Sequence, residues 1–247
     1  MNSPVASQTL IDELVTGNRI LFTEGVVDGF GHISVRHDAN PERFLIARSM
    51  APGLVTAADI VECDMQGEVQ DAQGRRSYAE RFIHSAIYAA RPDVMSVIHS
   101  HSPAIIPFGI TGARLRPICH MSGFLGSATP VFEIRHAAGE STDLLIRSQA
   151  LGVALAHSLG SHCVALMRGH GSVTVGSSIK QAVFRAIYTE SNARLQTQAM
   201  QLAGTLAGSM ASEITYLTDG EAQSASAMND EHLDRPWQMW KLRAFSA

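Results

Sequence analysis

The stretch VMSVIHSHSP at residues 94–103 predicts a buried strand that ends in two histidines. Its first five residues have the composition of a strand, and Pro103 stops the strand just beyond the histidines. Because residues i and i+2 of an extended chain point to one side, His99 and His101 share a face. Two imidazoles so placed can bind one metal ion. The alternative is two polar residues at a strand exit, since this short motif is weak alone.

A third histidine completes a candidate metal site. His170 lies between two glycines in Arg168-Gly169-His170-Gly171, where the backbone can turn sharply and be approached closely. Three neutral imidazoles can hold a divalent cation and leave coordination positions open, as catalytic metal sites do. The alternative for His170 is a turn histidine that is bonded to the backbone.

Glu80 stands 19 residues before His99, at the start of an amphipathic stretch over residues 79–91 that Pro92 ends. The helical spacing predicts that its carboxylate lies on the apolar side, where burial raises a carboxyl pKa. Such a carboxylate, near the metal but not a ligand, can move protons. The alternative is an ordinary acidic residue in the first turn of a helix.

Bulk composition indicates one large domain and excludes several partners. The 247 residues are 45% hydrophobic and 17% charged, with a formal net charge of -4. With no Lys/Arg-rich run, nucleic acid and anionic membranes are poor partners, and no apolar run is long enough to span a membrane. The N-terminus lacks the pattern of a secretory signal, and three widely spaced cysteines predict no disulfide framework. We therefore expect a reduced, cytoplasmic protein.

Periodicity along the chain predicts alternating helices and strands. Trp237 and Trp240 stand out in a C-terminal segment, residues 206–247, that otherwise loses periodicity. We expect this segment to be disordered, or to be a lid or a contact with another subunit. Helices are predicted at residues 9–25, 79–91, 143–159 and from Ser177 or Ser178 to about Leu202, and strands at 33–35, 44–46, 60–63, 94–98, 129–134, 164–167 and 172–175.

The remaining polar candidates are less informative. His84 either supports Glu80 or packs in the core, and Glu190 is either a buried partner of an arginine or a sign that its helix rotates outward. The five histidines that lie in polar or helix-end contexts are expected at the surface; they are His37, His136, His157, His162 and His232.

Together these features resemble the class II aldolase/adducin family over about residues 10–202. The resemblance rests on Gly-x-Ile-Ser-Val-Arg at 31–36, Leu-Ile at 45–46, Ala-Asp-Ile-Val at 58–61, Glu-Arg-Phe-Ile-His at 80–84, the two histidines at 99 and 101, and Gly-His-Gly around residue 170. It implies an α/β/α fold with a central, mainly antiparallel sheet over residues 1–205. It also implies that the three histidines bind a divalent metal, that the glutamate handles a proton, and that the protein is a homo-oligomer, commonly a tetramer with sites between subunits.

The chain departs from the family's sugar-phosphate enzymes at their phosphate-binding positions. An asparagine is replaced by His32, a glycine-containing turn reads Ala47-Arg48-Ser49-Met50, and a Ser/Thr pair reads Tyr78-Ala79. A side chain at Met50 blocks close backbone approach, and the missing hydroxyls remove phosphate donors. We therefore expect a substrate without phosphate.

The replacements suit a planar, carboxylated substrate. Arg48 can grip a carboxylate in a bidentate manner, with His32, Ser49 and Tyr78 as further substrate-binding residues. By loose alignment, His120 takes the place of the tyrosine that donates a proton in the aldolases, so it joins Glu80 as a catalytic candidate.

The resemblance extends to a decarboxylase branch of the family. It implies a decarboxylase of an ortho-hydroxy aromatic carboxylate such as 3-hydroxy-2-methylpyridine-4,5-dicarboxylate, from vitamin B6 degradation. Mn²⁺ is the favoured metal, and Zn²⁺ or Co²⁺ also suit the same three imidazole ligands. The alternatives are a retro-aldolase acting on a non-phosphorylated hydroxy-carbonyl substrate, and a non-catalytic scaffold like adducin.

Overall fold

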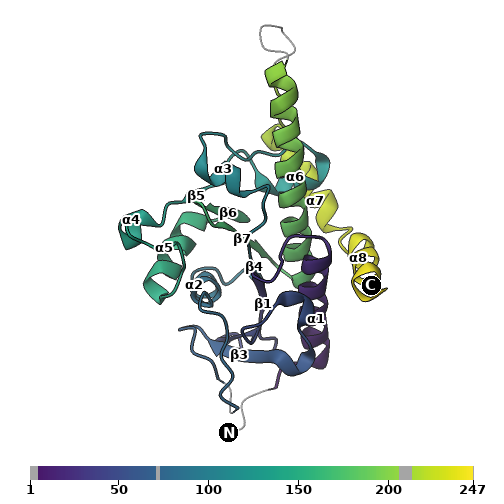
Figure 1. Ribbon diagram of the computed structural model, residues 1–247. Coiled ribbons are helices and arrows are strands. Elements are labelled where there is room, and N and C mark those ends of the chain that lie inside the picture. The colour runs from purple at the N-terminus through teal and green to yellow at the C-terminus, as the bar shows by residue number, and fades with distance from the viewer. Residues whose placement is uncertain (1–4, 71–72, 206–212, 247) are drawn as a thin grey trace.

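The computed structural model describes residues 5–70, 73–205 and 213–246, and within them seven strands form a single sheet (Figure 1). All neighbouring strands are antiparallel except the parallel pair β5–β6. The strand order is β3-β2-β1-β4-β7-β6-β5, which confirms the expected, mainly antiparallel sheet. The strands are β1 (His32–Arg36), β2 (Arg43–Ala47), β3 (Ile60–Asp64), β4 (Ser96–Ser100), β5 (Val131–Phe132), β6 (Val164–Met167) and β7 (Gly171–Gly176).

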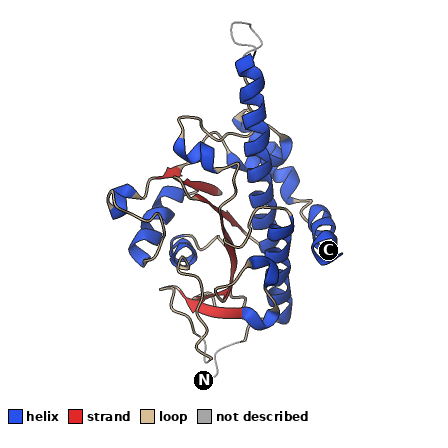
Figure 2. Ribbon diagram, in the orientation of Figure 1, coloured by secondary structure: helices blue, strands red, loops and turns tan. Residues whose placement is uncertain are grey.

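Helices cover both faces of this sheet, as Figure 2 shows, so the architecture is the predicted α/β/α sandwich. One face packs against α2 (Phe82–Ala90) and α5 (Gln149–Leu159), and the other against α1 (Gln8–Thr23) and α6 (Ile179–Thr205). Helix α8 (Asp234–Ser246) packs on the outer side of α1 and α6. The remaining helices are α3 (Ile106–Ile110), α4 (Arg135–Ala138), α7 (Asp219–Asp230) and three 3₁₀ turns, η1 (Pro52–Leu54), η2 (Ala57–Asp59) and η3 (His120–Leu125).

Strand β4 shows why the strands read as continuous apolar runs. Its neighbours Val97 and Ile98 point to opposite faces: Val97 joins the core with α2 and α5, and Ile98 joins the core with α1 and α6. Because helices cover both faces of the sheet, neither side of a strand faces solvent, and apolar and polar residues do not alternate along it. All five residues of β4 are buried, including His99, so this histidine is held rigidly.

Two helices begin later than the periodicity predicts. Helix α2 begins at Phe82, so Glu80 lies in the turn before it and not in its first turn. Helix α5 begins at Gln149, where the Ser148 hydroxyl accepts a hydrogen bond from the Leu151 amide. The residues before Ser148 form a loop that contacts Glu80 instead of adding turns to the helix.

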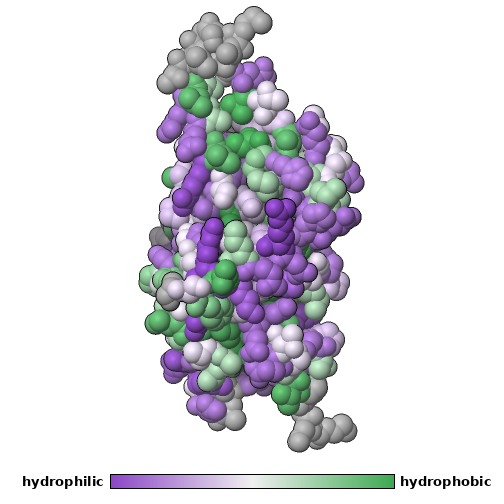
Figure 3. All heavy atoms as spheres, turned by 90° about the vertical axis from the view of Figure 1, so that its right-hand side faces the viewer, coloured by the Kyte–Doolittle hydropathy of each residue, from purple (hydrophilic) through white to green (hydrophobic). Residues whose placement is uncertain are grey.

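The described part of the C-terminal segment is helical and packs on its own chain, so the expectation of disorder is wrong for that part, while a lid or a subunit contact stays a prediction. Trp237 and Trp240 are 4% and 3% exposed and lie in the core with Phe184. Arg243 at the end of α8 pairs with Glu24, 3.1 Å between Nη1 and Oε1. Figure 3 views this side, where hydrophobic side chains lie in small groups among hydrophilic ones. Residues 206–212 and 247 fall outside the described chain.

No described helix has both the length and the apolar character that crossing a membrane requires.

Candidate active site

The antiparallel pairing of β1, β4 and β7 brings four histidines to one end of the sheet, namely His32, His99, His101 and His170. His99 on β4 pairs with His32 on β1 and with Val173 on β7. His101 lies one residue past the end of β4, and His170 lies in the turn that joins β6 to β7. The sheet register therefore places the three histidines of the sequence prediction together.

The three imidazoles converge through their Nε2 atoms. His101 Nε2 lies 3.0 Å from His99 Nε2 and 2.9 Å from His170 Nε2. Two nitrogens about 2.1 Å from one ion, with ligand angles of 90 to 109°, lie roughly 3.0 to 3.4 Å apart. The observed spacings fit such a cation, and with Glu80 the ligand atoms all lie within 4.8 Å of one another.

Glu80 faces the same point. Its Oε2 lies 3.5 Å from His99 Nε2 and 3.6 Å from His170 Nε2, and its Oε1 accepts a hydrogen bond of 2.9 Å from the Ile146 amide. One carboxylate oxygen is thus fixed by backbone while the other is directed at the histidines. Sequence reasoning missed Ile146, because the loop before α5 carries no motif that marks it.

The protonation of these groups suits metal binding. Burial lowers the pKa of His170 to about 4 and also lowers the pKa of His101, so both imidazoles are neutral near pH 7. His99 Nδ1 lies 3.1 Å from the Ser172 carbonyl. Donation to that carbonyl leaves the lone pair on His99 Nε2, as metal-binding histidines require.

The expectation that burial raises the Glu80 pKa is wrong in its net effect. Burial does raise it, but the hydrogen bond and charge of His99, the charge of His170 and the Ile146 amide outweigh burial and lower the pKa to about 2. Glu80 is therefore a carboxylate at neutral pH, ready to accept a proton before it can give one.

A pocket of about 540 Å³ opens beside the histidines. Glu80 and His101 line it together with His32, Ser49 and Tyr78, three of the predicted substrate-binding residues. The rest of the lining is largely apolar, from Phe30, Met50, Ala51 and Leu145. Tyr78 is held in place by its hydroxyl, which donates to the Met50 carbonyl at 2.8 Å.

Two predicted site residues lie elsewhere. Arg48 does not line the pocket, because its Nε is bound to Asp59 Oδ1 at 2.7 Å. The His120 side chain is exposed in η3, and its carbonyl accepts a hydrogen bond from Asn229 of α7. The chain before His120 is tied to α6, where the Ile118 amide donates to Asn192 Oδ1. These contacts are tertiary, and the local sequence carries no sign of them.

The structure also resolves the remaining candidates. Glu190 is buried and pairs with Arg194, 2.7 Å between Oε1 and Nε, and its other oxygen accepts from Ser102, next to His101. His84 does not touch Glu80; its ring bonds to His32 and Ser34. His37 is 2% exposed, contrary to the expected surface position, because its Nδ1 accepts from the Ala39 and Asn40 amides.

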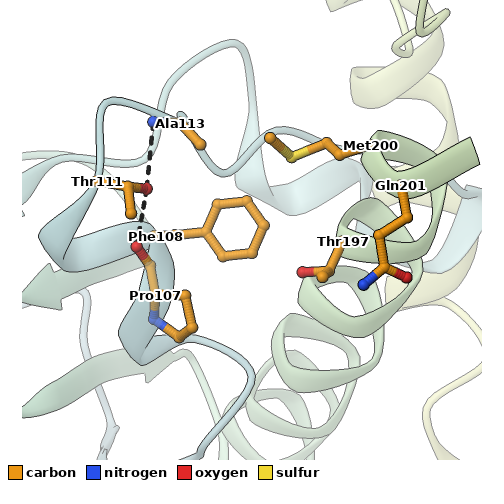
Figure 4. A pocket seen from close by; sticks show the side chains of 7 residues that line it. All are labelled: Pro107, Phe108, Thr111, Ala113, Thr197, Met200 and Gln201. Carbon is orange, nitrogen blue, oxygen red and sulfur yellow. Dashed lines mark hydrogen bonds between the residues drawn. The ribbon is translucent and has the colours of Figure 1, made fainter. Parts of the chain in front are cut away.

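A second pocket, of about 320 Å³, lies between α3 and α6 (Figure 4). Phe108, Met200 and Pro107 dominate its lining, with Thr111, Ala113, Thr197 and Gln201. No acidic, histidine or cysteine side chain is among these lining residues.

Comparison with known proteins identifies the family. A family model described as class II aldolase and adducin N-terminal domain matches residues 12–197, and the chain belongs to this family. It is 37% identical to "Decarboxylase tropJ" of Talaromyces stipitatus, covering 97% of this chain and 95% of the relative. It is 29% identical to a 3,4-dihydroxyphthalate decarboxylase of Arthrobacter keyseri, covering 88% and 89% of the two chains.

Solved structures agree on the fold. The chain superposes on L-fuculose 1-phosphate aldolase from Glaciozyma antarctica PI12 with a TM-score of 0.74, covering 98% of this chain and 93% of that one. Their sequences are 22% identical, so this likeness concerns the fold alone.

Proposed function

We propose that this protein is a metal-dependent decarboxylase of aromatic carboxylates that carry a hydroxyl ortho to the leaving carboxylate. The observation that carries the proposal is the convergence of His99, His101 and His170 with Glu80 beside a largely apolar pocket that Glu80 and His101 line. A divalent cation bound by the three imidazoles would act as a Lewis acid toward the negative charge that develops as CO₂ leaves. The decarboxylase relatives support this reaction class.

The pocket walls favour a flat, unphosphorylated ring. Met50 occupies the turn at which the family's sugar-phosphate enzymes have glycine, and Tyr78 presents a ring to the pocket. His32 and Ser49 offer hydrogen bonds suited to a second carboxylate. Both 3,4-dihydroxyphthalate and 3-hydroxy-2-methylpyridine-4,5-dicarboxylate carry a hydroxyl and two carboxylates on three consecutive ring carbons. We propose a substrate with this pattern.

We infer that Glu80 carries one proton through the cycle. As a carboxylate at neutral pH, it accepts the proton of the substrate hydroxyl when the substrate binds. The C–C bond then breaks, CO₂ leaves, and the bonding electron pair remains on the ring carbon. Glu80 returns the proton to that carbon, so the carboxylate is regenerated, and the phenoxide oxygen of the product takes up one proton from water on release. His120 remains a candidate only if another copy of the chain supplies it, because its side chain is exposed in this one.

The test is CO₂ release by the Mn²⁺-loaded protein from 3,4-dihydroxyphthalate and, separately, from 3-hydroxy-2-methylpyridine-4,5-dicarboxylate, with ring absorbance followed in parallel. We expect release from at least one acid, abolished by a chelator and restored by Mn²⁺. Phthalate, which lacks the ortho hydroxyl, is the matched control and should not react.

Other results would redirect the proposal. An aldehyde product from a non-phosphorylated hydroxy-carbonyl compound, without CO₂ from either acid, would select the retro-aldolase. Failure to bind Mn²⁺, Zn²⁺ or Co²⁺ would contradict the metal site and favour a scaffold.

A further inference from the structure

Behind the pocket, four buried side chains form one continuous chain of hydrogen bonds. His32 Nδ1 lies 2.6 Å from His84 Nε2, and His84 Nδ1 lies 2.6 Å from Ser34 Oγ. Ser34 Oγ lies 2.8 Å from the Tyr88 hydroxyl. All four residues are at most 4% exposed.

Strand and helix periodicity explain this alignment. His32 and Ser34 are two residues apart on β1 and face the same side, while His84 and Tyr88 are four residues apart on α2 and lie one turn from each other. The two pairs meet where α2 packs on the sheet. Only His32, at one end of the chain, lines the pocket.

The direction of these hydrogen bonds follows from the Tyr88 phenol. The Tyr88 hydroxyl has two hydrogen-bond partners, Ser34 Oγ and the backbone of Val97, and the Val97 backbone lowers the phenol pKa, as a donating N–H does. Burial outweighs this and raises the pKa of Tyr88, so the phenol keeps its proton. If the phenol donates to Ser34, then Ser34 donates to His84 Nδ1, and His84 Nε2 donates to His32 Nδ1. The opposite direction would leave a buried phenol hydrogen without an acceptor, which is costly.

We propose that His84, Ser34 and Tyr88 are positioning residues that hold His32 in the tautomer with its proton on Nε2. Within the described chain no group is bonded to His32 Nε2, and its ring lines the pocket against Tyr78, with ring centroids 4.5 Å apart. The pocket wall therefore presents a fixed neutral donor. This assignment deepens the proposed function: the donor binds the substrate carboxylate that is not lost, and it disfavours a cationic group at that position.

The tautomer of His32 can be determined without measuring enzyme activity. In protein labelled with ¹⁵N-histidine and loaded with diamagnetic Zn²⁺, solid-state NMR distinguishes the two ring tautomers, and the His32 signals are those that vanish in His32→Asn. We expect a protonated Nε2 and an unprotonated Nδ1. A protonated Nδ1 on His32 would overturn the proposal, whatever reaction the protein catalyses.

A matched pair of variants tests the positioning role. The side-chain amide of His84→Gln can still donate to His32 Nδ1, whereas His84→Leu cannot. We expect His84→Leu to raise KM for 3,4-dihydroxyphthalate roughly tenfold, the effect of one hydrogen bond to a charged group, and His84→Gln to recover most of it. Ser85 is on α2 like His84, and its buried hydroxyl bonds to Gln149 of α5, so Ser85→Ala is the control and should leave KM unchanged.

A truncated substrate identifies the group that is bound. With 2,3-dihydroxybenzoate, which lacks the second carboxylate, His84→Leu and the parent protein should differ little in KM. An equal penalty for both substrates would overturn the assignment to the second carboxylate. If no aromatic acid is decarboxylated, the proposed function fails, but the NMR result still decides the tautomer.

Discussion

At the scale of single residues, the Glu80 carboxylate decides how protons move. We expect Glu80→Gln to lower kcat by at least about 100-fold, since general acid–base groups contribute about 10²–10⁴. The amount of bound Mn²⁺ per protein chain should stay close to that of the parent protein, because three imidazoles remain to hold the ion. Steady-state kinetics together with metal analysis after dialysis provides the measurement. Equal loss of metal and activity would instead make Glu80 a fourth ligand, and the exposed substitution Glu68→Gln is the control for altered charge.

Single residues also mark the limit of sequence reasoning. His99 and His101 could be placed together because strand geometry alone fixes an i, i+2 pair. Arg48 could not be placed, since its binding to Asp59 depends on how η2 packs beside β2. The sign of the Glu80 pKa shift was also out of reach, because it depends on neighbours that the fold brings close from residues 99, 146 and 170.

At the scale of elements, the close packing of β4 against β7 positions the metal-binding histidines. A Cβ at Gly171 would lie 2.0 Å from the Ser100 carbonyl oxygen, so Gly171→Ala must push the two strands apart between His101 and His170. We expect this variant to lose most Mn²⁺ affinity in calorimetric titration.

Gly169 offers a matched control in the same turn. It has a φ of +66°, and a Cβ there would meet nothing closer than 3.7 Å. Asparagine tolerates this left-handed conformation, so Gly169→Asn should retain most of the affinity. Equal affinity in both variants would show that strand spacing does not control the site.

Helix α8 gives a second test at this scale. Trp240 is 3% exposed and packs near Phe184 and Tyr188, so Trp240→Ala should lower the free energy of unfolding by about 3–5 kcal/mol. Leu242 lies on the same helix but is 70% exposed, so Leu242→Ala should cost about 0.5 kcal/mol or less. Denaturant unfolding measures both. Similar small effects would contradict the docking of α8 on its own chain.

The local sequence predicts some of the helices and loops of this fold and leaves others undetermined. Helix α6 could be predicted, because Ser178 accepts a hydrogen bond from the Gln181 amide as an N-cap and a long periodic stretch follows. The docking of α8 could not, because two tryptophans three residues apart suit a core, a lid or a subunit contact equally well. Likewise, nothing local distinguishes the loop before α5 from another turn of helix; it is fixed by contacts such as Ile146 with Glu80.

At the scale of the whole molecule, strand order and layers follow from the family more than from local pattern. Periodicity predicts where strands are, but the order β3-β2-β1-β4-β7-β6-β5 joins β4 to β1 and β7 across more than sixty residues of sequence. The family resemblance supplied the layers and the mainly antiparallel sheet, whereas the strand order comes from the structure. The homo-oligomer remains a proposal, and mass measurement in solution would test the tetramer directly.

The buried histidines make the stability of the whole fold depend on pH. His84 is fully buried, and burial together with the charge of His99 lowers its pKa from the ordinary 6.5 to about 3. Above pH 6.5 both folded and unfolded states hold it neutral, so it contributes no pH dependence there. As the pH falls below 6.5, His84 binds a proton in the unfolded chain but stays neutral in the folded state. The free energy of unfolding therefore decreases until the pH reaches about 3, where His84 is protonated in the folded state as well.

We therefore expect the free energy of unfolding of the metal-free protein to fall between pH 6.5 and 4, with His84 contributing about 1 kcal/mol per pH unit. Urea unfolding at several pH values measures this slope. In His84→Gln the proton-binding group is gone from both states, so the slope should be smaller by that amount while its sign is kept, because burial also lowers the pKa of His32. A slope that the substitution leaves unchanged would mean that His84 has the same pKa in the folded and unfolded chains. That result would contradict the complete burial of His84 where α2 packs on β1.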